Sequence, residues 1–168
     1  LRTLVIPQTA TLLAKSGSGI ATSYEINPSL LSSADSFISF SRNSWLGGVS
    51  GQKVSVVSKT NKYISFETLS VTDIELRDDI ASDTPLGFFG AYWYALDFSK
   101  SRKIDSGFLK DMNFGYKVKL NFSKLYTETM RGYTVDFGIN KQMNNKLSLG
   151  LVAKNIGNES STSSLFFK

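Results

Sequence analysis

Few residue types in this chain could carry out catalysis or bind a metal. The 168-residue sequence contains no His and no Cys. This composition excludes metal sites built on imidazole or thiolate, Ser–His–Asp and Cys–His catalytic machinery, and any disulfide framework. We therefore expect no enzyme activity, no metal and no cofactor.

Lysines, amides and one aspartate at alternating positions form the one coherent polar set in the sequence. On one face of a sheet they could line a mildly cationic lumen and contact the polar end of a ligand or a plug segment. They could equally form an ordinary solvated face, on which Asp136 balances Lys119. A lysine acting as a general base would need a partner acid or nucleophile, and the sequence shows no candidate for either. The candidate lumen-facing residues are Lys117, Lys119, Asn121, Asp136, Asn140 and Lys154.

Two further patterns favour a structural interpretation. The acidic residues of segment 73–79 surround Arg77 and offer the oxygen ligands that Ca²⁺ takes. Their spacing is not that of an EF-hand, so we expect a solvated loop. Gly17 and Gly19 are not followed by the Gly-Lys-Ser/Thr of a phosphate-binding loop, and we expect a turn or plug there.

Alternation of period two marks the strands that must position the polar set. Every second residue from Phe114 to Phe122 is apolar or aromatic, and the interleaved residues are Gly, Lys or Asn. Segments 131–141 and 147–154 repeat the pattern, which predicts an antiparallel meander. If residues 127–130 form the first loop, Phe122 faces Val135 and Lys117 opposes Asn140. Earlier strands are expected at 37–42, 45–58, 62–72 and 87–101.

The N-terminal residues follow a different pattern. The segment from Gln8 to Lys15 could form a short helix that the following glycines end. Asn27 and Pro28 indicate a cap followed by proline at the first helical position. We expect residues 1–35 to form a plug or hatch-like segment and residues 36–168 to form strands.

Periodicity alone leaves two all-β architectures open. In a soluble sandwich the apolar face is the core, whereas in a transmembrane β-barrel it contacts lipid. Mean hydropathy is −0.10 and no run of about 18 apolar residues is present, which suits either. Strands of about ten residues match a bilayer crossing better than the usual soluble strand. Tyrosines near the strand ends would suit interfacial girdles, so the barrel is favoured.

A series of short motifs runs in order along the chain. The N-terminal motifs are Leu4–Pro7, Ser18–Ala21 and Asn27–Leu31. The later motifs are Ser44–Trp45, Thr84–Tyr92, Asp136–Ile139 and Leu149–Gly157. Taken in this order, the motifs resemble the PorV/PorQ family of FadL-like outer-membrane barrels associated with type IX secretion.

The resemblance implies an antiparallel barrel of roughly fourteen strands with an N-terminal plug. We count seven strands, an odd number, and expect the chain to be an incomplete part of such a barrel in the bacterial outer membrane. The implied role is secretion or anchoring of surface proteins in an envelope assembly. The implied partners are outer-membrane lipid or lipopolysaccharide, secretion-system subunits and exported proteins.

Two other functions stay open. One is a FadL-like transporter of hydrophobic small molecules with a lipid-like ligand inside. The other is a soluble β-sandwich binding module. Nucleic acid is not expected, because the lysines and aromatics of the best strands lie on opposite faces and a stacking platform needs both on one.

Overall fold

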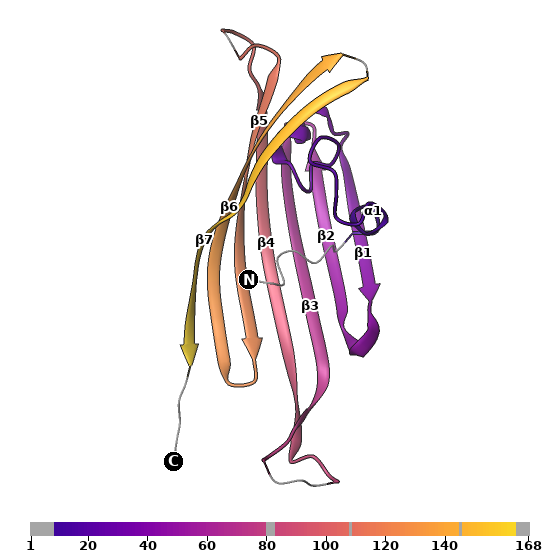
Figure 1. Ribbon diagram of the computed structural model, residues 1–168, viewed down its shortest axis with the longest axis vertical. Coiled ribbons are helices and arrows are strands. Elements are labelled where there is room, and N and C mark those ends of the chain that lie inside the picture. Colours follow the sequence, from indigo (N-terminus) through magenta and orange to yellow (C-terminus); the bar gives the residue numbers. More distant parts are fainter. Residues whose placement is uncertain (1–8, 80–82, 108, 145, 164–168) are drawn as a thin grey trace.

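The computed structural model describes residues 9–79, 83–107, 109–144 and 146–163. They form one seven-stranded antiparallel sheet in which each strand pairs with its sequence neighbours (Figure 1). The strands are β1 (Phe37–Ser44), β2 (Ser50–Ser58), β3 (Lys62–Leu76), β4 (Gly87–Lys103), β5 (Met112–Leu125), β6 (Glu128–Asn144) and β7 (Leu147–Ser163). The helices are α1 (Ala10–Ala14) and the short 3₁₀ turns η2 (Pro28–Ser33) and η3 (Leu46–Gly48). The antiparallel all-β prediction is therefore confirmed at this level.

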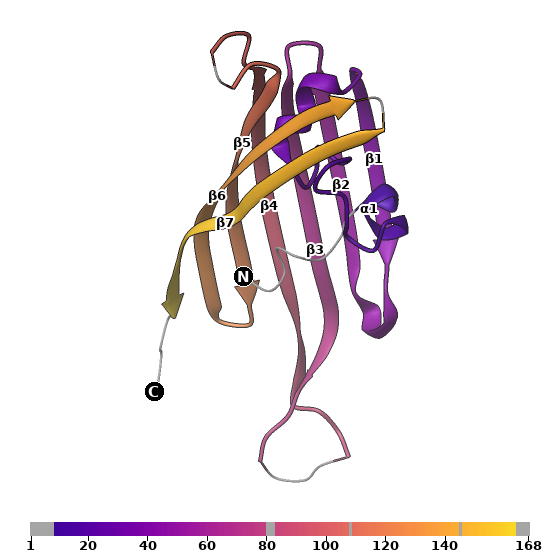
Figure 2. The same cartoon turned by 45° about the horizontal axis from the view of Figure 1, so that its top comes forward.

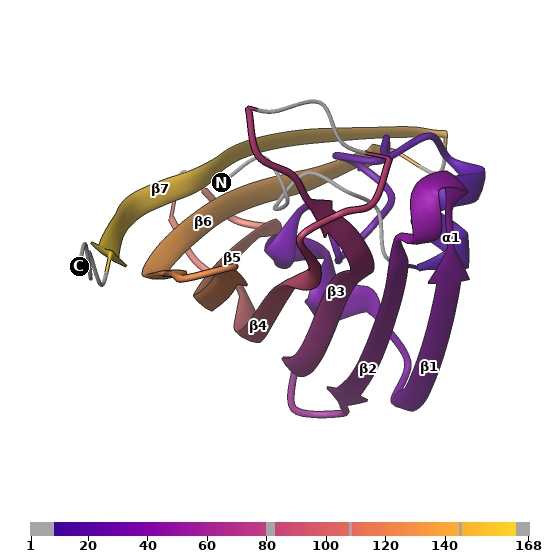
Figure 3. The same ribbon diagram turned by 90° about the horizontal axis from the view of Figure 1, so that it is seen from below.

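The sheet is curved but open. Within the described residues β1 and β7 form its two unpaired edges. The strands wrap around the N-terminal segment, which lies against their concave face (Figures 2 and 3). No helix in the described ranges is long and apolar enough to cross a membrane.

The N-terminal segment has the local structure that the sequence predicts. Thr9 caps α1 by accepting a hydrogen bond from the Leu12 amide at 3.2 Å. Ser16 and Gly17, both with positive φ, follow the helix. Asn27 is the N-cap of η2, and Pro28 occupies the first helical position, where its missing N–H costs nothing.

Two strand predictions were wrong in detail. β2 begins at Ser50 rather than at 45, because Gly47 and Gly48 adopt positive φ and turn the chain before it. The β5–β6 register also differs from the prediction. Phe122 pairs with Arg131, and Val135 pairs with Val118, because the strands continue to a tight turn between Leu125 and Glu128.

This register error is a shift of four residues, so it leaves each side chain on its predicted face. It does change the neighbours: Lys117 lies opposite Asp136, and Asn140 lies opposite Asn113. The prediction had placed residues 127–130 in a loop. In the structure Thr129 and Met130 continue the ladder of β6.

Burial is inverted relative to an ordinary globular domain. Charged side chains on the concave face are almost fully buried, with Glu67 3% and Asp97 1% exposed. Apolar side chains on the convex face are open, with Ile38 76% and Leu151 68% exposed. Among the described residues no second sheet covers the convex face.

Candidate functional site: the plugged concave face

The N-terminal segment is anchored to the sheet through Asn27, which is fully buried. Its amide nitrogen donates to the carbonyl oxygens of Ile20 at 2.9 Å and of Ile139, on β6, at 3.1 Å. Its amide oxygen accepts from the backbone N–H of Ser29 at 3.1 Å and from the Ser29 hydroxyl at 2.7 Å. Every donor and acceptor of the side chain is thus used, which makes its burial favourable.

A pair of glycines makes room for this anchor. Gly115 of β5 and Gly138 of β6 lie directly opposite each other in the sheet. A Cβ at Gly115 would overlap the Pro28 backbone, and one at Gly138 would overlap the Asn27 amide oxygen. The Asn27–Pro28 turn therefore needs two adjacent positions without side chains. The sequence predicted a structural role for both residues, and these contacts supply its physical reason.

Apolar contacts hold the next part of the segment. Leu31 of η2 is fully buried against Val57 and Tyr63, two inward-facing residues of β2 and β3. The Tyr24 ring packs on that of Tyr63, with centroids 5.7 Å apart. Burial, with the neighbouring Glu25 carboxylate, raises the pKa of the Tyr24 hydroxyl, so that it stays protonated.

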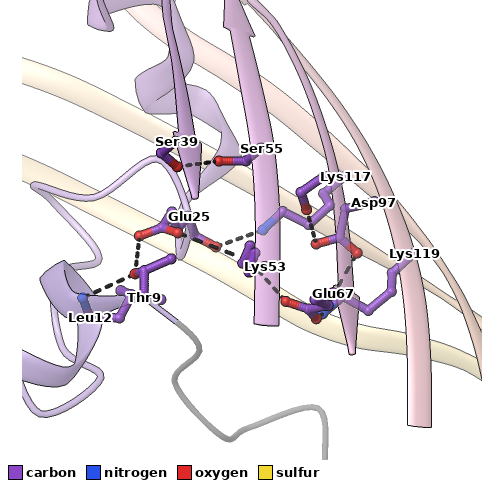
Figure 4. A network of polar contacts seen from close by, with 11 residues as sticks. Thr9, Leu12, Glu25, Ser39, Lys53, Ser55, Glu67, Asp97, Lys117 and Lys119 are labelled. Carbon is purple, nitrogen blue, oxygen red and sulfur yellow. Dashed lines mark hydrogen bonds and ion pairs between the residues drawn. The ribbon is translucent and has the colours of Figure 1, made fainter. Parts of the chain in front are cut away.

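A network of buried ion pairs crosses the concave face from β2 to β5 (Figure 4). Glu67 of β3 lies at its centre. Its carboxylate is 2.9 Å from the ammonium of Lys53 and 2.8 Å from that of Lys119. Asp97 of β4 extends the network, with its Oδ1 3.7 Å from Lys119 and its Oδ2 accepting from the Ser65 hydroxyl at 3.3 Å.

The N-terminal segment joins this network through Glu25. Its carboxylate lies 4.0 Å from the Lys53 ammonium and accepts a hydrogen bond from the Thr9 hydroxyl at 2.9 Å. Its backbone carbonyl accepts from the ammonium of Lys117 at 2.6 Å. Segment and wall therefore satisfy each other's polar groups, and buried charges need such partners.

The structure brings together only part of the predicted polar set. Lys117 and Lys119 lie side by side on β5 in the network. Asp136 is inward but caps a bulge in β7, where its carboxylate accepts from the backbone N–H of Asn155 at 2.6 Å. Asn140 donates to the Ser148 hydroxyl and the Leu149 carbonyl, so it joins β6 to β7. Lys154 lies in the bulge and is exposed, outside the network.

Sequence reasoning missed four members of the network, Glu25, Lys53, Glu67 and Asp97. The three strand residues share a detectable signal. Each lies at an alternating position that faces the same way as its inward neighbours, such as Ser55, Ser65 and Ser99. Assigning the faces of the predicted strands 45–58, 62–72 and 87–101 residue by residue would have found these three residues. Glu25 lies outside any periodic segment and gives no such signal.

An apolar cavity of about 410 Å³ lies next to the network. Its lining includes Leu69, Trp93 and Leu125. Ser123 of β5 also lines the cavity, and Asn121 is the inward residue that precedes it on the strand. The Asn121 side chain is 7% exposed, and neither its nitrogen nor its oxygen has a hydrogen-bond partner among the described residues. A buried amide of this kind can accept a polar ligand group or a water.

The acidic segment is solvated, but the prediction of a loop was wrong for Asp73 and Glu75, which belong to β3 because that strand continues past its bulge to Leu76. The Arg77 guanidinium pairs with Glu75 at 2.7 Å, and both side chains are about half exposed. Asp78 accepts from the backbone N–H of Asp79 at 2.7 Å. Within the described part of the chain, no three His, Cys, Asp or Glu residues are grouped as metal ligands.

Comparisons of the chain with protein-family models, with curated proteins and with solved structures found no match.

Proposed function

We propose that this chain forms the wall and plug of a bacterial outer-membrane β-barrel that serves secretion or anchoring of surface proteins. The observation that carries the proposal is the inverted burial of the sheet, with its charges inside and its apolar side chains outside. Removing apolar surface from water is worth about 25 cal/mol per Å². A whole apolar sheet face left in water would be strongly unfavourable, and lipid is the surrounding that favours it.

Strand length and side-chain order support the membrane location. β4, β6 and β7 each have 17 residues, enough to cross a bilayer with tilt and to extend beyond it. One row of outward residues across the sheet is wholly apolar. It consists of Ile38, Val56, Ile64, Phe98, Val118, Val135 and Ile156.

A firmly held plug favours an anchoring or assembly role over an open pore. Asn27, Pro28, Ser29 and Leu31 are all buried against the sheet. Lys117 and Lys53, which would otherwise line a lumen, are engaged by the plug and by Glu67. This agrees with the PorV/PorQ resemblance, which implies an envelope assembly that handles exported surface proteins.

The test is purification of the native protein in mild detergent from its own membranes, followed by mass spectrometry of the proteins that co-elute. We expect secretion subunits or exported surface proteins in stoichiometric amounts. A Gly138→Ala variant, which disturbs the plug, should change that association, and Gly87→Ala should not, because a Cβ at Gly87 meets nothing within 4 Å. Recovery of the protein without detergent would refute the membrane location.

A second candidate function is transport or binding of hydrophobic small molecules, as in FadL-like barrels. Two observations favour it: the apolar cavity, and the unpartnered amide of Asn121, which precedes the cavity-lining Ser123 on the inward face of β5. Lipid extraction of the purified protein tests it. A lipid-like molecule that co-purifies with the native chain and is lost in Asn121→Leu would support transport, whereas equal amounts in both would oppose it.

A further inference from the structure

The charged residues that face outward on β1 to β6 are all basic in one part of the sheet. This part lies on the Lys62 side of the β3–β4 bulge, where the strand register is regular. The bulge lies between Val71 and Ile74. The acidic strand residues of this region, Glu67, Asp97, Glu128 and Asp136, occupy inward positions; all but Glu128, at the exposed start of β6, are buried. The outward charged residues are Arg42, Lys62, Lys100, Arg102, Lys124, Arg131 and Lys141.

Two of these lysines form a like-charge pair. Lys62 of β3 and Lys100 of β4 lie directly opposite each other. Opposed residues in a sheet have their Cβ atoms roughly 5 Å apart, and like charges there are destabilising. Both side chains are exposed, and neither has an ion-pair partner among the described residues. Arg102 lies two residues beyond Lys100 on the same face and is likewise exposed.

The pair borders the apolar surface. The next outward positions on the same two strands are Ile64 and Phe98, which also lie opposite each other. On the other side, Lys100 lies opposite Tyr116, whose ring is 6.4 Å from that of Phe98. Lysine stems can follow apolar surface while their ammonium groups reach a polar layer. The two ammonium groups are thus positioned at the edge of the apolar band.

We propose that Lys62 and Lys100, with Arg102 beside them, bind the phosphate of an anionic membrane-lipid headgroup. A phosphate between the two ammonium groups converts their repulsion into two charge-assisted hydrogen bonds. The acyl chains of the same lipid would lie along Ile64 and Phe98. The absence of outward acids in this region favours an anionic occupant over a cationic or zwitterionic one. This inference rests on the proposed membrane location.

The test compares the full chain refolded into phosphatidylglycerol vesicles, into phosphatidylcholine vesicles, and into phosphatidylcholine vesicles with inorganic phosphate. Flotation on a density gradient reports insertion, and the thermal melting midpoint reports headgroup binding. The test variant is Lys62→Gln/Lys100→Gln. The matched control is Lys59→Gln/Lys146→Gln, which removes two exposed lysines from turns outside the strands and makes the same change in net charge.

We expect the unaltered chain and the control to melt higher in phosphatidylglycerol than in phosphatidylcholine. The test variant should lose most of that difference, and in phosphatidylcholine it should melt above the unaltered chain because the repulsion is gone. An unchanged difference in the test variant would overturn the proposal. A full increase with inorganic phosphate alone would overturn the assignment to a lipid headgroup. Failure to float with either vesicle would instead overturn the membrane location.

Discussion

Gly138→Ala tests the idea that the glycine pair is what admits the plug. The new methyl group would overlap the Asn27 amide oxygen, so Asn27 or the whole turn must move. Asn27 makes four hydrogen bonds through its side chain. At about 0.5–1 kcal/mol each, the loss of all four should destabilise the docked plug by about 2–4 kcal/mol. The sheet itself should remain, because alanine is tolerated in strands at least as well as glycine.

Because the chain contains no Cys, the stability of the docked plug can be measured with one introduced thiol. Ser23 lies in the plug and is 5% exposed, so Ser23→Cys should react slowly with a water-soluble maleimide. Since about 1.4 kcal/mol corresponds to a factor of ten, Gly138→Ala should accelerate labelling about 30- to 1,000-fold. Gly115→Ala should act in the same direction, because its methyl would overlap the Pro28 backbone.

Gly87→Ala is the matched control, since it adds the same methyl to a strand position with nothing within 4 Å. It should leave the labelling rate of the Ser23→Cys chain unchanged. An equal rate in the Gly138→Ala and unaltered backgrounds, with the strand signal intact by circular dichroism, would refute the docking argument.

Three further predictions concern charges and the unpartnered amide. Glu67→Gln leaves two buried lysines without their shared carboxylate and should lower the free energy of unfolding by about 3–5 kcal/mol, measured by denaturant titration in micelles. Asn121→Leu removes two unsatisfied buried atoms and should leave stability equal or raise it by about 1 kcal/mol in delipidated protein; a loss of several kcal/mol would mean that the amide is satisfied. The hydrogen bond and charge of Lys103 hold the pKa of Asp111 below its ordinary 3.8, so this pair's contribution is complete above that value and is lost as the pH falls through the lower folded-state pKa. Asp111→Asn should remove that acid-range dependence from a pH series of melting curves.

The faces of the strands could be predicted from the sequence, but the neighbours could not. Alternation places Lys117 and Lys119 on one face of the strand and Val118 and Leu120 on the other, whichever residues pair across strands. The face of a side chain depends only on its odd or even position in the strand. Register depends on the turn, and the tight turn before Glu128 is compatible with the same alternation as a longer loop. A register error of four residues leaves the alternation unchanged, so the pattern could not reveal it. The error nevertheless changed the residue opposite Lys117 from Asn140 to Asp136.

The plug's contacts were beyond sequence reasoning for a different reason. Asn27 and Pro28 predict a capped turn because Asn is a preferred N-cap and Pro is favoured at the first helical position, and that turn is present. Their docking site depends on Gly115 and Gly138, which come from different strands and become neighbours only through the register. In sequence each glycine is simply an unremarkable member of the small, polar face of a strand.

Charge balance makes the wall and the plug depend on each other. The wall contributes three buried lysines to the network, Lys53, Lys117 and Lys119. Among the described strand residues, Glu67 pairs with Lys53 and Lys119, and Asp97 pairs with Lys119. Glu25 of the plug supplies a third carboxylate, near Lys53, and its carbonyl engages Lys117. Buried ions without partners are strongly unfavourable, so undocking the plug must either hydrate this face or bring another anion to it. The plug is thereby an integral part of the fold, and any process that moves it must replace Glu25.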